Sequence, residues 1–307
     1  MAATTTLTAP RRRSSPQERH NLRMGLLFAA PAILGLLLFT AYPIVASVYY
    51  SFTSYSVLQP GSWVGLENYR TLLTDDPLFY TTLYNTFFMA VFTIPLSVIV
   101  AMGLAMLLNL KVRGQAFYRT IFYLPTIVPF VASSVLWLWI YNPQYGIFNS
   151  LLWYAGIQGP GWLNDPAWAK PALIIMNLWT VGGWMVIYLA GLQDVPQELY
   201  EAAELDGARW WDRTWHLTLP FMSPYILFSV IQMVIGVFQY FTQVAVMTQG
   251  GPADATRVYA YYLYQNAFTF FRMGYASAMA WLLFIFVVIL TIFIFRTSAR
   301  RVYYGGQ

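Results

Sequence analysis

Long apolar runs, separated by short polar segments, set the pattern of this chain. A helix needs about 20 consecutive apolar residues to cross a bilayer, and runs of that length recur along the sequence. The pattern predicts an all-α, polytopic membrane protein with six transmembrane helices. The predicted spans cover about 24–50, 83–110, 120–141, 171–193, 220–247 and 273–295. Neighbouring helices can re-satisfy the backbone carbonyls freed by the prolines inside these spans, which are Pro31, Pro43, Pro95, Pro125 and Pro129.

The composition also indicates a membrane protein. Of 307 residues, 58% are hydrophobic and only 9% are charged, whereas soluble domains carry about 25% charged residues. Too few charges remain to coat a water-exposed surface, so one integral membrane domain over 24–296 is expected. The chain has no cysteine, and its two histidines, His20 and His216, are far apart in the sequence. Disulfides, thiolate ligands and a metal site are therefore not expected.

The basic residues are distributed unevenly between the two sides of the predicted spans. If the N-terminus lies inside, the 17 Lys and Arg residues divide into thirteen cytoplasmic and four on the opposite side. The thirteen are Arg11, Arg12, Arg13, Arg19, Arg23, Lys111, Arg113, Arg119, Arg209, Arg213, Arg296, Arg300 and Arg301, and the four are Arg70, Lys170, Arg257 and Arg272. Because basic loops stay in the cytoplasm, both termini are predicted to be cytoplasmic. The net charge of +5 then follows from topology, and no nucleic-acid partner is needed.

The first apolar run is expected to remain as a span and not to be removed as a signal peptide. It continues past Phe39 and lacks a small-x-small site followed by a polar start. Residues 1–23 are assigned to a basic cytoplasmic tail, whose part before Arg19 has the composition of a mobile segment. Residues 297–307 are assigned to a cytoplasmic C-terminal tail.

One predicted cytoplasmic loop, residues 194–220, is unusually acidic for so apolar a chain. Asp194 is predicted to cap a helix, with Pro196 in its first turn and Gln197 completing a capping box. Negative charge is stabilising near the N-terminus of a helix. The acids of the loop follow there at a helical spacing, as Glu198, Glu201 and Glu204.

Two kinds of partner are compatible with this acidic segment. Gly207 fits a helix stop, and a second short helix over 209–217 is expected to lead into the fifth span. Helices that lie on the cytoplasmic leaflet usually carry Lys and Arg, because that leaflet is anionic. The leaflet would repel an acidic helix, so docking of the short helix pair in a groove of another protein is favoured over a membrane-surface helix.

The segment EAAELDGA, followed after a spacer by LTLP, resembles the EAA loop of permeases from ATP-binding-cassette (ABC) importers. In that family the loop forms coupling helices that sit in a cleft of a cytoplasmic ATPase subunit. The resemblance implies that Glu201 supplies a docking hydrogen bond or ion pair and that Gly207 supplies the turn. Thr214 departs from the family pattern, which often has an aromatic residue there, and Trp215 can supply the bulk. The matching residues are Glu201, Ala202, Ala203, Asp206, Gly207, Ala208, Leu217, Leu219 and Pro220.

Further stretches resemble the carbohydrate-uptake branch of the same family, namely AYPIVASVYYSFT, VGLENY, YRTIFYLPTIVP and TQGGPADAT. The C-terminus, FRTSARRVYYGGQ, is similar to that of the maltose-type first permease, a binding-protein-dependent transport system inner-membrane component. The resemblance implies half of a heterodimeric pore for a sugar or oligosaccharide in a bacterial or archaeal cell membrane. It also implies a second permease subunit, two copies of an ATPase that hold ATP and Mg, and an extracytoplasmic solute-binding protein. The chain itself is then expected to be no enzyme and to bind no cofactor.

Polar stripes on two predicted spans point to a substrate path. In the fifth span, Gln232, Gln239 and Gln243 fall on one helical face. The same region also contains Gly236 and Tyr240, and the stripe of the fourth span comprises Asn177, Thr180, Trp184 and Tyr188. Amides that face lipid would forfeit hydrogen bonds, so both stripes are expected to face protein or a wet cavity. Binding of substrate and hydrogen bonding between helices are both compatible with this pattern.

The predicted spans contain no Asp, Glu, Lys, Arg or His in their cores, and the chain has no phosphate-binding loop motif. An ion-coupled carrier usually keeps charged groups in the membrane, and a membrane enzyme needs a catalytic cluster. A separate ATPase that acts through the acidic loop accounts for both absences. A glycerol-phosphate or polyol importer is the alternative, since Arg257 and Arg272 on the outer side are cationic. The outer segment 140–170 is expected to be ordered, either to meet a binding protein or to cap the bundle.

Overall fold

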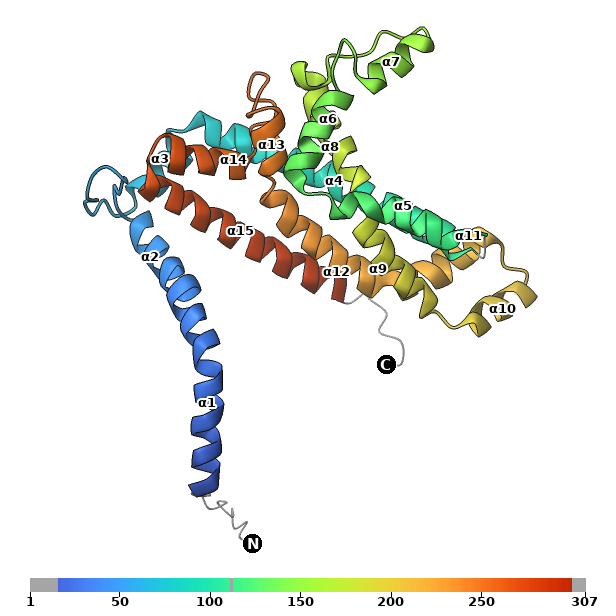
Figure 1. Cartoon of the computed structure of the whole chain (residues 1–307), viewed down its shortest axis with the longest axis horizontal. Helices are drawn as coiled ribbons and strands as arrows, with labels where there is room; N and C mark the ends of the chain where they lie inside the picture. Colours follow the sequence, from blue (N-terminus) through green and yellow to red (C-terminus); the bar gives the residue numbers. More distant parts are fainter. Residues whose placement is uncertain (1–15, 111–112, 300–307) are drawn as a thin grey trace, which may run out of the picture.

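The computed structural model describes residues 16–110 and 113–299, and in these ranges every regular element is helical (Figure 1). The all-α class is thereby confirmed. The longer elements are α1 (Pro16–Leu36), α2 (Tyr42–Ser51), α4 (Pro77–Asn109), α5 (Gln115–Ile127), α6 (Phe130–Ile140), α8 (Pro166–Trp179), α9 (Gly182–Gln193), α12 (Leu219–Phe238) and α15 (Met273–Ala299). The shorter ones are α3 (Glu67–Thr74), α7 (Ile147–Tyr154), α10 (Gln197–Leu205), α11 (Trp210–Arg213), α13 (Thr242–Met247) and α14 (Tyr259–Tyr264), with π turns at Leu37–Ala41, Thr214–Thr218 and Gln265–Thr269 and a 3₁₀ turn at Trp162–Asn164.

The number of candidate membrane spans is compatible with the prediction. Four helical stretches in the described part of the chain are long and apolar enough to cross a membrane, and the number reaches the predicted six if each of the bent pairs α5–α6 and α8–α9 is counted as one span. The first span is longer than predicted, because α1 begins at Pro16 inside the predicted N-terminal tail. Residues 1–15, 111–112 and 300–307 lie outside the described residues, so the mobile tail before Arg19 and most of the C-terminal tail stay predictions.

Prolines inside the spans have different local effects. Pro31 and Pro95 lie within the unbroken helices α1 and α4. Pro43 follows the π turn Leu37–Ala41, which joins α1 to α2. A proline has no N–H and crowds the carbonyl group four residues earlier, and a π turn gives the local backbone a different hydrogen-bond pattern. The first span therefore continues through Pro43 as one helical rod.

The third predicted span is broken, so the expectation of one helix over 120–141 was wrong. α5 and α6 meet at 102° across Val128 and Pro129. Val128 is extended, with φ −71° and ψ 127°, which is the conformation that a following proline favours. Pro125, in contrast, stays within α5. The chain therefore changes direction at the second proline and not at the first.

The fourth and fifth predicted spans are also interrupted. α8 and α9 are bent by 48° at Thr180. Just beyond this bend, a Cβ on Gly182 would lie 2.1 Å from the carbonyl oxygen of Phe122, so glycine is required for α9 to pack this closely on α5. The fifth span stops being helical at Gln239 and resumes at Thr242. No proline or glycine stands at this break, and nothing in the structure explains why the helix ends there.

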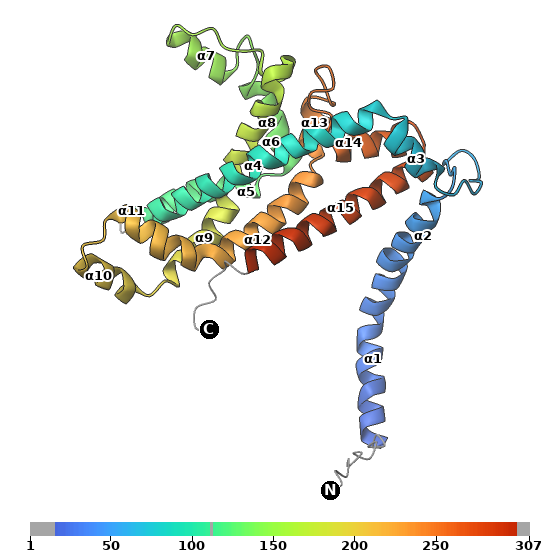
Figure 2. The ribbon, with the colours of Figure 1, turned by 180° about the vertical axis from the view of Figure 1, so that it is seen from behind.

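α4 is the central helix of the bundle. It packs against α8, α9 and α12, and it buries Met89 and Met102 in two of the apolar clusters. Figures 1 and 2 show α3 and α14 at one end of the bundle and α10 and α11 at the opposite end. α7 stands out from the bundle, and the α1 rod swings away from it with exposed apolar side chains such as Phe28. The sequence predicts that the end carrying α10 and α11 lies in the cytoplasm, and the end carrying α3 and α14 is called the outer end on the basis of that prediction.

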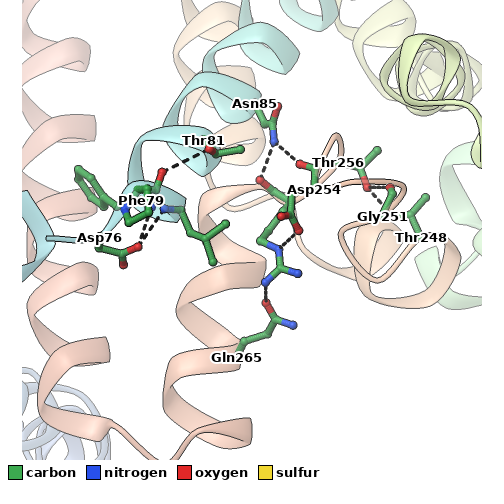
Figure 3. Close-up of polar contacts among 12 residues, drawn as sticks. Asp76, Phe79, Thr81, Asn85, Thr248, Gly251, Asp254, Thr256 and Gln265 are labelled. Atoms are coloured by element: carbon green, nitrogen blue, oxygen red, sulfur yellow. Dashed lines mark hydrogen bonds and ion pairs between the residues drawn. The ribbon is translucent and has the colours of Figure 1, made fainter.

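At the outer end, Asn85 of α4 holds the loop that follows α13 (Figure 3). Its Nδ2 donates to the carbonyl oxygens of Asp254 at 2.8 Å and Arg257 at 3.0 Å. Its Oδ1 accepts from the Nζ of Lys170 at 2.9 Å. One buried amide therefore joins α4, α8 and residues 248–258, which include the stretch TQGGPADAT.

Asp76 joins α4 to α14 and α15 at the same end. Its Oδ1 accepts from the N–H groups of Leu78 (3.0 Å) and Phe79 (3.2 Å), which caps α4 (Figure 3). Its Oδ2 accepts from the hydroxyl groups of Tyr262 (2.7 Å) and Tyr275 (2.5 Å). Burial, and then the hydrogen bond to Asp76, raise the pKa of Tyr262 to about 12. This hydroxyl group therefore stays protonated at neutral pH and donates to the carboxylate.

Asn85→Leu is expected to destabilise the outer end of the protein. The substitution keeps the size of the side chain but leaves two carbonyl groups and the Lys170 ammonium without their partner, at a cost of about 2–4 kcal/mol. The thermal unfolding midpoint of the purified protein in detergent should fall. Asn109→Leu, at the exposed end of the same helix, should leave it nearly unchanged. Equal midpoints for the two variants would contradict the role assigned to Asn85.

Candidate functional site

The acidic segment forms two short helices, α10 and α11, but its predicted N-terminal cap was wrong. Pro196 occupies the cap position and no side chain caps α10. Asp194 instead ends α9, and its Oδ2 accepts from the hydroxyl group of Tyr225 on α12 at 2.5 Å. Gln197 donates to Glu201 at 2.8 Å and forms no capping box. α9 extends to Gln193, and Asp194 is the residue that ends it. The side chain of Asp194 is therefore directed to Tyr225 and not to the first N–H groups of α10.

The C-terminal end of α10 agrees with the prediction. Gly207 adopts φ +77° and donates its N–H to the carbonyl oxygen of Glu204 at 3.0 Å. Ala208 donates to the carbonyl oxygen of Ala203 at 2.9 Å, which is the long bond of a Schellman motif. A Cβ on Gly207 would meet nothing within 4 Å. Its left-handed backbone, and not crowding, is therefore what favours glycine here.

The predicted ATPase-coupling residues lie on and beside the exposed helix α10. Leu205 at its tip has 90% of its surface exposed, and an apolar side chain this exposed marks a face that no described part of the chain covers. Exposed residues of the predicted set are Glu201, Ala202, Asp206 and Gly207, and half-buried ones are Ala203, Ala208, Leu217, Leu219 and Pro220. The last two begin α12, so the set extends from the exposed tip to the base of a membrane span.

The second short helix is also present. α11 and the π turn Thr214–Thr218 occupy the predicted range and continue directly into α12. An ion pair between Arg213 and Glu204 joins it to α10. Thr214, the departure from the family pattern, is buried, and its Oγ1 donates to the carbonyl oxygen of Trp210 at 2.9 Å. Its neighbour Trp215 is exposed. The departure therefore lies on the inner side of the segment, away from its exposed surface.

A cavity of about 350 Å³ lies between the membrane helices. All the residues predicted for a substrate path line it, namely Asn177, Trp184, Gln232, Gln239, Tyr240 and Gln243. They come together for a reason that differs in part from the prediction. Gln232 and Gly236 share a face of α12, but this helix ends at Phe238. The non-helical backbone after it brings Gln239 and Tyr240 to the cavity, and Gln243 reaches it from the start of α13.

The cavity has further lining residues. Thr180 and Gly236 were predicted with the two stripes, and the residues that were not predicted are Thr93, Ser97, Phe130, Val181, Met233, Val237, Phe241 and Thr242. Thr93 and Ser97 are four residues apart on α4, and this spacing of two small polar residues in an apolar span could have identified them. Tyr188 of the predicted stripe faces protein, which is one of the two environments expected for it. It is buried against α12, where its hydroxyl group pairs with Ser229.

The chemistry of the cavity is polar but uncharged. Its described lining residues include no Asp, Glu, Lys, Arg or His. The hydroxyl groups of Thr93 and Tyr240 are buried without a hydrogen bond of ordinary geometry. These side chains are only 6% and 7% exposed, and buried polar groups normally find a partner. The described lining therefore presents amide groups, hydroxyl groups and aromatic rings, and no ionisable acid or base among Asp, Glu, Lys, Arg and His.

Six spans, an exposed helix pair at one end and an uncharged cavity between the helices define a membrane permease. The family model for binding-protein-dependent transport system inner membrane components matches residues 93–303. The chain belongs to this family and is a multi-pass membrane protein. The resemblance noted in the sequence, to permeases of ABC importers, is confirmed.

Individual relatives agree with this assignment. The chain is 39% identical over 287 residues to the probable ABC transporter permease protein YesP of Bacillus subtilis, which covers 92% of this chain and 93% of that protein. It is 36% identical over 264 residues to the sulfoquinovosyl glycerol transport system permease protein SmoG of Agrobacterium fabrum, with 85% of each covered. The fold is shared with a bacterial ABC transporter involved in the import of the acidic polysaccharide alginate, with a TM-score of 0.80 at 24% identity over 93% of this chain and 99% of that chain.

Proposed function

We propose that this chain is one of two different permease subunits that together form the pore of an ATP-driven importer for a neutral sugar or oligosaccharide. The uncharged cavity carries this proposal, because amides, hydroxyl groups and aromatic rings are the groups that bind sugars. The lactose transport system permease protein LacF of Rhizobium radiobacter is 36% identical over 285 residues, which cover 90% of this chain and 94% of that protein, and its name supports a neutral carbohydrate as the substrate class. Gln232 and Gln239, whose exposed side chains line the cavity, are the residues best placed to hold the sugar.

A phosphorylated polyol such as glycerol phosphate is the alternative substrate. It would need a cation near the path, and the candidates from the sequence were Arg257 and Arg272. Arg257 pairs with Asp254 at 2.8 Å and donates to Gln265 at 3.0 Å (Figure 3). Arg272 lines a separate outer pocket beside Asp76. Neither residue lines the membrane cavity, so the arrangement favours a neutral solute.

The energy of ATP acts on the end of the molecule that carries α10 and α11. In this proposal both termini and α10 lie in the cytoplasm, and α10 docks in a cleft on one of two ATPase copies that hold ATP and Mg. The chain itself is no enzyme. Glu201 supplies a hydrogen bond or ion pair to that cleft, and the exposed Leu205 supplies apolar contact. On the outer face an extracytoplasmic binding protein delivers the sugar.

Transport then follows from movement of the coupling segment, which is the acidic segment 194–220 with α10 and α11. Binding of ATP closes the ATPase dimer and displaces α10 together with its equivalent on the second permease. The pore changes from inward-facing to outward-facing, and the binding protein releases the sugar into it. After hydrolysis the pore returns and the sugar leaves to the cytoplasm. The uncharged cavity holds the sugar by hydrogen bonds between these states.

The proposal is tested by purifying the chain with its neighbouring permease and ATPase and reconstituting the complex in lipid vesicles with the binding protein. Uptake of radiolabelled neutral sugars should depend on ATP and should stimulate its hydrolysis, and glycerol 3-phosphate should do neither. Uptake driven by a proton or sodium gradient without ATP would overturn the proposal. If the vesicles take up glycerol 3-phosphate and none of the sugars, the substrate is the phosphorylated polyol and not a sugar.

Gln239→Ala is expected to weaken transport without affecting assembly. The side chain is exposed to the cavity, and loss of a hydrogen bond of about 1 kcal/mol corresponds to a roughly fivefold increase in the KM for uptake. Gln59→Ala, in an exposed outer loop, is the matched control. If the two variants transport equally well, Gln239 joins helices and does not contact substrate.

A further inference from the structure

Two side chains of the coupling segment form hydrogen bonds to α12 or to the residue directly before it. Near its start, the Oδ2 of Asp194 accepts from the hydroxyl group of Tyr225 on α12 at 2.5 Å. Within α10, the Oη of Tyr200 lies 2.9 Å from the Oγ1 of Thr218, the residue directly before α12. Both side-chain contacts therefore lead to α12, although the chain enters the segment from α9.

The contact between Tyr200 and Thr218 is a hydrogen bond between two hydroxyl groups, either of which can donate. Thr218 has 4% of its surface exposed, and its Oγ1 also lies 3.4 Å from the carbonyl oxygen of Arg213. The phenol ring of α10 is thus anchored on a buried hydroxyl group at the base of a membrane helix.

The backbone around Thr218 is not regular α-helix. Thr214–Thr218 form a π turn, and Pro220 follows within the first turn of α12. Pro220 lacks an N–H group and crowds the carbonyl group of His216 four residues earlier, which accounts for the wider turn. Isolated π turns of this kind often occur at functional sites. The π turn ends at Thr218, and the Tyr200–Thr218 bond attaches α10 to this end of the turn.

The link to α10 is reinforced by a second contact. Arg213, one residue before the π turn, forms the ion pair with Glu204 of α10. Tyr200 and Glu204 lie one helical turn apart on α10, so the helix is held at two points of the segment that leads into α12. A displacement of α10 must therefore move the start of α12 as long as these contacts persist.

The opposite half of α12 reaches the cavity. Gln232 and Gly236 line it, and Gln232 lies about 21 Å along the helix from Thr218 at 1.5 Å per residue. α12 also packs against α4, the helix that contributes Thr93 and Ser97. A movement applied at Thr218 thus reaches the cavity wall through a single helix.

We propose that Tyr200 and Thr218 are positioning residues that transmit the displacement of α10 to α12. This inference rests on the proposed function, because it assigns a route to the coupling step. Without the hydrogen bond, α10 can shift against the base of α12, and part of the ATPase motion is absorbed at the π turn. The ATPase then hydrolyses ATP in cycles in which the pore does not switch between its inward-facing and outward-facing states.

The test measures the number of ATP molecules hydrolysed for each sugar molecule taken up by reconstituted vesicles. Tyr200→Phe and Thr218→Val each remove a hydroxyl group and should raise this ratio roughly fivefold, the factor expected for one hydrogen bond. The double variant should be no worse than either single one, because both remove the same interaction. Thr218→Ser keeps the hydroxyl group and should retain the wild-type ratio. Tyr118→Phe, on an exposed position of α5, is the control for loss of a phenol oxygen.

The outcomes separate this inference from the function on which it rests. An unchanged ratio in Tyr200→Phe, or fully additive effects in the double variant, would overturn the transmission role while sugar uptake by the wild type stood. Failure of the wild-type complex to retain its ATPase would overturn the proposed function instead. If Thr218→Val does not assemble, Tyr200→Phe decides alone, since it removes only one partly exposed oxygen atom.

Discussion

Gly207→Pro is expected to reduce sugar-dependent ATP hydrolysis roughly 100-fold while the permease still folds into the membrane. Gly207 holds φ +77°, whereas a proline ring fixes φ near −65°. Proline also removes the N–H group that bonds to Glu204. The end of α10 must then unwind, and the exposed tip with Leu205 loses its shape. The membrane helices make no use of this turn, so the damage should stay within the coupling segment.

The measurement is retention of the ATPase on the purified permease, together with sugar-dependent hydrolysis in vesicles. Gly156→Pro is a matched control, because Gly156 has φ +74°, donates its N–H to Trp153 three residues earlier, and has open space around its Cβ. It follows α7, which stands out from the bundle separately from α10 and α11. Retention of the ATPase should fall in Gly207→Pro and not in Gly156→Pro. An equal loss in both variants would indicate general misfolding and contradict a specific role for Gly207.

Local rules of sequence predicted the coupling segment well where the signal was backbone geometry. Gly207 ends α10 because few other residues tolerate its left-handed conformation, and this could be recognised without a structure. The cap at Asp194 failed for a different reason. An aspartate two residues before a proline is compatible with the start of a helix and equally with the end of one. Here Asp194 ends α9 and does not begin α10. The partner that occupied its carboxylate, Tyr225, is 31 residues away and has no local signature.

The breaks within the spans show the limit of reading prolines from sequence. Pro95 lies inside α4, which stays continuous, and Pro129 ends α5. Pro95 is the only proline of its predicted span, whereas Pro129 follows Pro125 by four residues, and the packing around the two prolines also differs. α4 is held by α8, α9 and α12, and these neighbours favour a continuous helix. The break at Gln239 carried no signal, yet it brings the predicted polar residues to the cavity.

The cavity itself followed from sequence only in part. Glutamines at helical spacing showed that one face of the fifth span is polar, because amides are costly to bury in lipid. Their spacing does not reveal which helix faces them. Thr93 and Ser97 on α4 close the opposite wall, and a residue pair from a distant span becomes part of a site only through packing. Hydroxyl groups of threonine and serine are also common in membrane helices for purely structural reasons.

Gly236→Leu is expected to reduce sugar uptake at least tenfold while it increases the helical propensity of α12. Gly236 lines the cavity, and a Cβ there would meet nothing within 4 Å. The larger side chain therefore fits without backbone strain, and replacement of a helical glycine by leucine stabilises a helix by up to about 1 kcal/mol. The side chain must then occupy space in a cavity of about 350 Å³. A loss of about 1.4 kcal/mol in sugar binding is already tenfold in affinity.

The matched control is Gly103→Leu. Gly103 is also a helical glycine with open space around its Cβ, but it lies on the exposed surface of α4 and does not line the cavity. Both variants should assemble with the partner subunits and show equal thermal stability. Only Gly236→Leu should lose uptake, and it should do so with ATPase retention intact, which distinguishes a blocked path from a broken coupling segment. Equal uptake by the two variants would mean that the sugar does not pass this cavity, and the polar residues around it would then serve to hold the helices together.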